Sequence, residues 1–308
     1  MTDAAAGLAT PRIRRYQRPH SAALLVVPAV AVLLLMTVAP AIYLLWSSLF
    51  RFNLLASEAG VFVGLGNYAD VLGSADFIRS FGITLLFVVA SVSLELAIGL
   101  MVAVLLARKG RDLQIASGLL ILPMAITPVV AALVWRALLN PNYGWIDYYL
   151  QTAGLIKEPI AWLSAPLTAW IALLALDVWQ WMPFVALILL AGLQGLPTEP
   201  LEAASVDGAG RLGMFRFITL PMMRPFIVIA VLLRTVDAFK TFGTVQVLTN
   251  GGPGDATEIV NLSIYRVALQ DFQVGTAAAM GIVFLIVVTI VIQQMLRVMA
   301  RNTDVLDD

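Results

Sequence analysis

EAASVDGAGRLGMFRFITLP, residues 202–221, is a short polar stretch between two long apolar segments. Its first three residues favour a helix, and the pair Asp207 and Gly208 favours a break, because glycine readily adopts a positive φ. The stretch closes with Pro221, where long apolar sequence resumes. We therefore expect a polar loop that turns at Asp207 and Gly208 and connects two apolar helices.

The composition of the whole chain is that of an integral membrane protein. Of its 308 residues, 60% are hydrophobic and only 12% are charged, and its mean hydropathy is +0.91. Soluble globular domains average about 45–50% apolar and about 25% charged residues. Cysteine is absent and the single histidine, His20, lies near the N-terminus. We therefore expect no catalytic residue, no disulfide framework and no metal site.

The lysines bear on whether the chain binds a nucleotide. Lys109, Lys157 and Lys240 do not lie in the G-x-x-x-x-G-K-[ST] pattern that cradles nucleotide phosphates. The sequence therefore contains no P-loop of its own. If ATP powers this protein, another polypeptide binds the nucleotide, and this chain binds no cofactor.

Six apolar segments are long enough to be membrane-spanning helices, which need about 20 largely apolar residues. They cover residues 22–49, 80–107, 114–139, 165–194, 217–239 and 276–298. The predicted organisation is an all-α membrane domain of six transmembrane helices at 22–298, flanked by tails at 1–21 and 299–308. The polar loop at 198–221 joins the fourth and fifth spans.

The first span has some features of a signal peptide. Arginines precede it, and the sequence APA at 39–41 is typical of a cleavage site. However, the apolar run continues past that point to Phe50, which is too long for the apolar core of a signal peptide. We therefore interpret it as a retained helix.

The distribution of basic residues predicts the orientation of the spans. Cytoplasmic loops of membrane proteins carry an excess of lysine and arginine. Most basic residues of this chain, including the N-terminal arginines and the group at 108–111, lie inside if both termini are inside. This N-in, C-in arrangement also places residues 202–221 in the cytoplasm.

Two of the spans carry polar side chains at helical spacing, although polar groups at membrane depth are costly. Four residues in each span follow the spacing i, i+3, i+4 and i+7 and therefore share one face. These faces consist of Asp177, Gln180, Trp181 and Phe184, and of Arg234, Asp237, Ala238 and Thr241. Such faces suit a sugar path, because sugar hydroxyls donate and accept hydrogen bonds and sugar rings pack on aromatics. Pro183 is also expected to disrupt the fourth span.

A structural role for the same polar residues is the alternative interpretation. Arg234 and Asp237 could form an ion pair along one helix, and the aromatic residues of the fourth span could serve packing. For Glu95, near the middle of the second span, a polar contact to another helix is the favoured interpretation. Arg136 and Asn140 end the third span, where a gate and a contact with lipid headgroups are both possible.

Several stretches of the chain resemble the permeases of ABC importers. EAA at 202–204, then Gly208, then ITLP at 218–221 resemble the EAA loop of that family. LTNGGP at 248–253 and GTAAAM at 275–280 resemble its carbohydrate branch, in which permeases of the maltose and glycerol-phosphate type are most similar. Glycine and proline in LTNGGP also predict a sharp turn there.

The resemblance extends over residues 20–300 and implies the core of a type I ABC importer permease in a bacterial inner membrane. In that family the EAA loop is a pair of short cytoplasmic helices that docks into a cleft of the ATPase subunit. The residues expected to couple this chain to an ATPase are Glu202, Ala203, Ala204, Asp207, Gly208, Arg211 and Phe215.

The implied partners follow from the same resemblance. They are a second homologous permease, two ATP-binding subunits that hold ATP and Mg²⁺, an extracytoplasmic sugar-binding (lipo)protein, the sugar and membrane lipid; no nucleic acid is implied.

In the maltose-type importer the sugar contacts correspond to the two polar faces described above. Here charged side chains replace small or amide ones, so maltose is not the expected sugar. A disaccharide remains expected, and similarity to trehalose importers makes trehalose a candidate.

The competing hypothesis is a self-sufficient carrier or channel. In that case Asp177, Asp237 and Glu95 would bind protons or sodium within the membrane, and residues 202–221 would be merely structural. A carrier driven by protons would lose uptake when an uncoupler is added while ATP is maintained, whereas an ABC importer would not.

Overall fold

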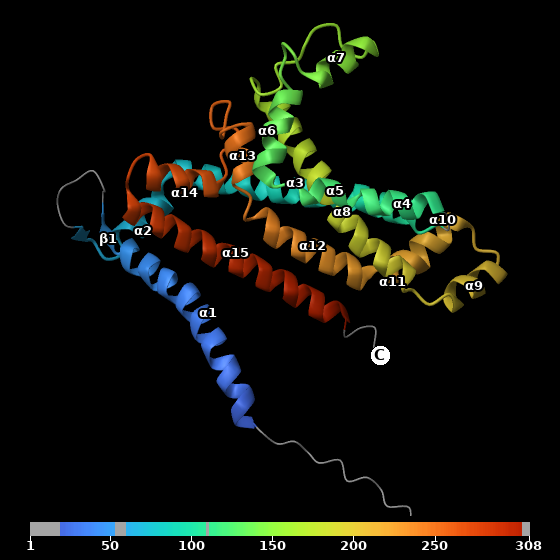
Figure 1. Ribbon diagram of the computed structural model, residues 1–308, viewed down its shortest axis with the longest axis horizontal. Helices are drawn as coiled ribbons and strands as arrows, with labels where there is room; N and C mark the ends of the chain where they lie inside the picture. Colours follow the sequence, from blue (N-terminus) through green and yellow to red (C-terminus); the bar gives the residue numbers. More distant parts are fainter. Residues whose placement is uncertain (1–18, 53–59, 109–110, 304–308) are drawn as a thin grey trace, which may run out of the picture. The chain divides into compact units, whose positions relative to one another are not determined.

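The computed structural model describes residues 19–52, 60–108 and 111–303, and nearly all of their regular structure is helical (Figure 1). In chain order the elements are α1 (Pro19–Ser48), β1 (Phe50–Arg51), β2 (Val61–Phe62), α2 (Gly66–Gly73), α3 (Ala75–Leu106), α4 (Arg111–Leu119), α5 (Ile121–Ala125), α6 (Pro128–Leu138), α7 (Trp145–Thr152), α8 (Pro166–Gln194), α9 (Glu199–Val206), α10 (Arg211–Met214), the π-helix η1 (Phe215–Thr219), α11 (Leu220–Met222), α12 (Arg224–Ala238), α13 (Gly243–Leu248), α14 (Val260–Leu269) and α15 (Val274–Thr303).

The chain divides into two compact units, one ending at Trp46 and the other beginning at Ser47. The first unit is made of α1, whose Val26–Ser48 part is long and apolar enough to cross a membrane. The helix continues through Pro28 and Pro40, which fits the expectation of one uninterrupted first span. Most of the predicted N-terminal tail and part of the C-terminal one lie outside the described residues.

Three helices of the second unit are also long and apolar enough to cross a membrane by themselves: α3, α8 and the Val274–Arg297 part of α15. They correspond to the second, fourth and sixth predicted spans. α3 begins earlier than predicted, because Ser74 caps it: Phe77 N donates to Ser74 Oγ at 3.3 Å. The predicted and observed positions of these three spans therefore agree apart from their ends.

The third predicted span is not one straight helix. Ile115–Ala125 and Pro128–Leu138 meet at 95°, and the residues between them are extended, with ψ of 134° at Ile126 and 142° at Thr127. The ring of a proline pushes the preceding residue out of the helical region, so Pro128 accounts for the break.

The fifth predicted span is bent as well. A bend of 63° separates Arg211–Met222 from Arg224–Ala238. Pro225 lies in the first turn of α12, and because it lacks an N–H it cannot continue the helix that precedes it. Among the described residues, six spans are therefore obtained only when each bent pair is counted as one, whereas four helices reach membrane-spanning length alone.

Two smaller expectations need correction. Pro183 does not break the fourth span, since α8 continues from Pro166 to Gln194 with Pro183 inside it. The described residues are also not purely helical, because Phe50 pairs with Phe62 and Arg51 with Val61 in a short antiparallel ladder. This ladder connects the beginning of the second unit to the loop before α2.

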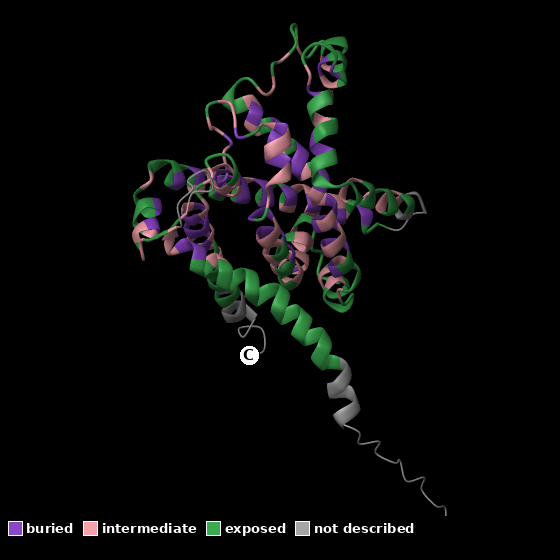
Figure 2. Ribbon diagram, turned by 60° about the vertical axis from the view of Figure 1, so that its left-hand side comes forward, coloured by how far each residue is buried: buried purple, intermediate pink, exposed green. Residues whose placement is uncertain are grey.

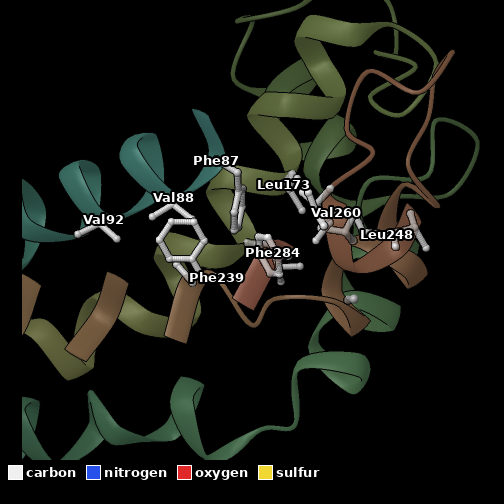
Figure 3. Close-up of a cluster of buried hydrophobic side chains, with 14 of the residues drawn as sticks. Phe87, Val88, Val92, Leu173, Phe239, Leu248, Val260 and Phe284 are labelled. Carbon is white, nitrogen blue, oxygen red and sulfur yellow. The ribbon is translucent and has the colours of Figure 1, made fainter. Parts of the chain in front are cut away.

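The apolar core of the second unit lies where α3, α8, α14 and α15 approach the end of α12. Figure 3 shows Phe87, Phe239 and Phe284 packed around one point, and the rings of Phe239 and Phe284 meet edge to face at 6.1 Å. α3 and α8 form the most extensive helix pair. Figure 2 shows buried residues gathered where these helices meet, while the outward faces of the long helices are exposed. Exposed apolar faces are typical of helices that contact lipid.

The loop between α13 and α14 turns sharply, as LTNGGP predicts. Asn250, Gly251 and Gly254 have φ of +48°, +80° and +54°. Arg266 fixes the turn, because its Nη2 donates to Asn250 O at 2.6 Å and its Nη1 pairs with Glu258. Burial raises the pKa of Glu258 above its usual value, and the charge of Arg266 opposes that rise.

Candidate functional site

The polar loop after α8 folds as short helices joined by a turn. α9 contains the EAA run and ends at Val206, and Asp207 caps its C-terminus. Gly208 follows with a φ of +80°, and Ala209 N donates to Ala204 O at 2.9 Å, which closes the helix. The predicted turn at Asp207 and Gly208 is thus confirmed.

The same loop presents apolar side chains at its surface. Val206, Leu212 and Phe217 are 88%, 80% and 74% exposed. Arg211 begins α10, and Phe215 begins η1, where it is half-buried. Several exposed apolar side chains in one short polar loop are typical of a surface that contacts another protein.

Arg234 of α12 is the centre of a buried ion network that joins three helices. Its Nη2 lies 2.9 Å from Glu95 Oε1 on α3 and 2.6 Å from Asp177 Oδ2 on α8. A further contact of 2.6 Å between Arg234 Nε and Glu95 Oε2 is an ion pair without hydrogen-bond geometry. All three side chains are at most 2% exposed. Because a buried charge without a partner costs several kcal/mol, these charges depend on one another.

The network continues to the protein surface through Asp237. Arg234 Nη1 lies 3.2 Å from Asp237 Oδ2, and Lys240 Nζ lies 3.6 Å from Asp237 Oδ1. The Trp181 ring lies over the guanidinium of Arg234 at 5.3 Å. The ion pair between Arg234 and Asp237, and the contact of Glu95 with another helix, are therefore confirmed.

A small pocket of about 160 Å³ lies at the exposed end of this network. Three of the predicted path residues line it, namely Trp181, Asp237 and Thr241. Its other lining residues lie outside the two predicted faces, and they are Pro128, Lys240, Phe242, Gly243 and Thr244. Lys240 was detectable, because it follows Asp237 by three residues and precedes Thr241. Pro128 was not, since it belongs to a different span.

The remaining predicted path residues do not line this pocket. Asp177 and Gln180 are each 1% exposed, Ala238 is also 1% exposed, and Phe184 is half-buried. Asp177 instead binds Arg234, as described above. In this conformation of the isolated chain, the face of α8 that carries Asp177 and Gln180 is therefore directed toward neighbouring helices.

Gln180 contacts the break in the third span. Its Nε2 donates to Ile126 O at 2.7 Å, and its Oε1 is buried without a hydrogen-bond partner. Ile126 is one of the extended residues between α5 and α6. Beyond the break, Arg136 of α6 donates to Val247 O of α13 at 3.1 Å. Gln180 thus holds the position where the pocket residue Pro128 begins α6.

Comparison with known proteins identifies the family. Residues 95–305 match the family described as "Binding-protein-dependent transport system inner membrane component". The chain is 35% identical over 264 residues to the trehalose/maltose transport system permease protein MalF of Thermococcus litoralis, covering 85% of this chain and 88% of that protein. It is 34% identical over 263 residues to the trehalose transport system permease protein SugA of Mycobacterium tuberculosis, covering 84% and 82%.

The fold is also similar to that of a solved transporter chain. In the crystal structure of a bacterial alginate ABC transporter in complex with alginate pentasaccharide-bound periplasmic protein, one chain aligns with a TM-score of 0.76. The alignment covers 89% of this chain and 92% of that chain at 20% identity. With the match over most of its length, the chain belongs to the family of binding-protein-dependent transport system inner membrane components.

Proposed function

We propose that this chain is the permease subunit of an ATP-driven importer and forms part of the path for a neutral sugar, a disaccharide such as trehalose. The observation that carries the proposal is the short-helix loop around Gly208, with its exposed Val206, Leu212 and Phe217. This loop connects directly to α8 and, through η1 and α11, to α12, the two helices that contribute most of the ion network. The names of the curated relatives support import of a disaccharide.

The proposed orientation has both termini inside and the α9–α10 loop in the cytoplasm. In this arrangement two ATPase subunits bind ATP and Mg²⁺, and one of them receives the loop. Glu202 meets a cation on that ATPase, and the turn at Gly208 lets the helix pair move as a rigid body. Because α8 and α12 flank the loop, its displacement rotates both helices and opens the path. The chain itself is not catalytic.

The size of the pocket supports the requirement for a second permease. Ligand pockets usually measure about 300–1,000 Å³, whereas the pocket beside Trp181 measures about 160 Å³. A disaccharide therefore needs additional walls, which a second homologous permease facing this one supplies. The alginate transporter forms a complex with a periplasmic protein that carries an alginate pentasaccharide. That complex supports an extracytoplasmic binding protein as the partner that delivers the sugar.

Within the pocket, Trp181 offers a ring face to the sugar, and Asp237 and Thr241 offer hydrogen-bonding groups. Lys240 compensates the charge of Asp237, so the lining carries no large excess charge and favours a neutral sugar. Glu95, Asp177 and Asp237 all bind Arg234, so an ion-coupled carrier would have to release carboxylates that the chain already pairs.

The test of this function is purification of the tagged chain from native membranes in mild detergent, with every co-purifying polypeptide identified. An ATPase and a second permease in the eluate are expected. If the chain instead purifies alone, stable and monodisperse, and its uptake stops when an uncoupler is added at maintained ATP, then the ion-coupled carrier replaces this proposal.

Reversing the charge of Glu202 is expected to uncouple the importer. Charge repulsion at a protein interface costs several kcal/mol, so Glu202→Lys is expected to lower sugar uptake at least about ten-fold, by the relation of about 1.4 kcal/mol per factor of ten. Delivery by the binding protein is expected to persist. Glu199→Lys is the matched control, because Glu199 is exposed on the same helix but lies outside the EAA run. Normal uptake by the Glu202→Lys variant would contradict the coupling role.

Removing the ring of Trp181 is expected to weaken the sugar contact. Aromatic contacts contribute about 0.5–1.5 kcal/mol beyond burial, so Trp181→Ala is expected to raise the KM for uptake roughly three- to ten-fold. The variant is expected to keep its ATPase subunits. Trp179→Ala is the control, since Trp179 lies on the same helix and packs on Trp135 at 5.9 Å outside the pocket. Equal KM values for both variants would exclude the pocket as the sugar path.

A further inference from the structure

The segment between α6 and α8 encloses a second and larger pocket. Ten residues between Pro141 and Pro159 line a volume of about 540 Å³, within the range of pockets that bind small molecules. Figure 1 shows α7 beyond α6, on the side away from α9. Among the described residues, this pocket shares none of its lining with the pocket at Trp181. Because its walls come from one continuous segment, it needs no partner chain.

The lining combines aromatic rings with amides. Tyr143, Trp145, Tyr148 and Tyr149 are 62–70% exposed, which is high for large rings. The rings of Tyr148 and Tyr149 meet edge to face at 5.4 Å. Asn142 and Gln151 add amide groups to the same lining. Pyranose rings pack their C–H faces on aromatic rings and exchange hydrogen bonds with amides, so this set suits a saccharide.

Several contacts fix the frame that holds the rings. Asp147 is only 3% exposed, and its two carboxylate oxygens accept hydrogen bonds from Ile160 N at 3.1 Å and Trp162 Nε1 at 2.8 Å. At the other end, Asn142 N donates to Asn140 Oδ1 at 2.9 Å. A Cβ at Gly144 would lie 2.4 Å from the Asn140 carbonyl oxygen, so the chain is tightly folded there. The rings are therefore presented on a preformed support.

The charges of the lining select an uncharged ligand. Among the described residues that line the pocket, Asp147 is the only acidic one, and its oxygens are already engaged. No lysine or arginine belongs to that lining, so an anionic ligand would find no counter-charge. A cation would find only the engaged carboxylate.

We propose that the pocket of residues 141–159 is a binding site for a neutral saccharide, separate from the path through the membrane. It rests on the proposed function in two ways: import of a sugar makes a saccharide the expected ligand, and the proposed orientation places this segment outside the cell. Two sources have the required chemistry: the free disaccharide, which the site would hold near the entrance of the path, and the pyranose chain of a longer glycan outside the cell.

The test uses the full chain in lipid nanodiscs and saturation-transfer NMR. The probes are trehalose, maltose and a hexamer of N-acetylglucosamine, so a response to the disaccharides or to the hexamer alone distinguishes the two sources. Trp145→Ala and Tyr148→Ala are each expected to weaken binding about three- to ten-fold. Tyr43→Ala is the control, because Tyr43 is 60% exposed but lies on α1, and it is expected to leave binding unchanged.

Two results would overturn the site. One is saccharide binding that is equal in the Trp145→Ala and Tyr43→Ala variants, or absent in the unmodified chain. The other concerns the fluorescence of Trp145, which is obtained by subtracting the spectrum of the Trp145→Ala variant. If brominated lipids quench this fluorescence and added saccharides do not reduce the quenching, the rings anchor the segment in the membrane interface. Failure of the importer function would appear separately, as a missing ATPase in the purified complex. The saturation-transfer measurement of saccharide binding would still be interpretable in that case.

Discussion

Replacement of Arg234 by methionine is expected to lower the free energy of unfolding by about 3–5 kcal/mol, the range found when one partner of a buried ion pair is removed. The reason is that Glu95 and Asp177 would remain almost fully buried without their guanidinium partner. The measurement is the fraction of monodisperse chain that survives a temperature series in detergent. The variant is expected to lose its folded population at a markedly lower temperature than the unmodified chain.

A variant without charges in this network shows whether Arg234→Met destabilises the chain through its unpaired carboxylates or through the smaller side chain. The triple variant Glu95→Gln, Asp177→Asn and Arg234→Met leaves no unpaired ion, so it is expected to recover most of the stability. Arg136→Met is the matched single control, because Arg136 is exposed and makes one hydrogen bond to Val247 O. If Arg234→Met proves as stable as Arg136→Met, the three helices are held by packing rather than by this network.

Gly275→Ala is expected to destabilise the contact between α15 and the start of the second unit. A Cβ at Gly275 would overlap the Phe50 carbonyl oxygen at 1.9 Å and approach Asn67 Nδ2 at 3.2 Å. That oxygen also accepts a hydrogen bond from Asn67 Nδ2 at 2.9 Å, so it is not free to move. Overpacking against fixed backbone costs about 1–3 kcal/mol or more. The same thermal series in detergent measures the loss.

Gly281→Ala provides the comparison within the same helix. Apart from the chain neighbours and the backbone of α15 itself, no atom of the described residues lies within 4 Å of a Cβ built at Gly281. Alanine is the better helix former by about 0.8–1 kcal/mol, so this variant is expected to be at least as stable as the unmodified chain. A similar loss in both variants would mean that α15 tolerates no added methyl group anywhere, and the close approach to Phe50 would not be the cause.

Local signals predicted much of the fold. Long apolar runs located α3, α8 and α15, since length and hydropathy are properties of the segment alone. Asp207 and Gly208 located the turn of the polar loop, because the preference of glycine for a positive φ is also a local property. The 95° break before α6 escaped prediction although its cause, Pro128, is in the sequence. An average of hydropathy over a window registers how apolar a residue is and ignores which backbone angles it permits.

The candidate site was harder to predict, because helical spacing defines a face but not its neighbour. The spacing correctly grouped Arg234 with Asp237, which form an ion pair. It could not reveal that Asp177 and Glu95 meet the same guanidinium, which depends on how α3, α8 and α12 are rotated. Pro128 entered the pocket for a similar reason, because it belongs to a different span whose position relative to α12 the spacing does not give.

The distance along the chain between Glu95 and Arg234 has a consequence for biosynthesis. The two residues are 139 positions apart. At a synthesis rate of about 5–20 residues per second, roughly 7–28 s pass before the ribosome adds the arginine after the glutamate. During that interval the Glu95 carboxyl lacks its partner Arg234, and the Asp177 carboxyl lacks the same partner over the last 57 residues. The early helices therefore have a physical reason to stay beside the insertion machinery until α12 arrives.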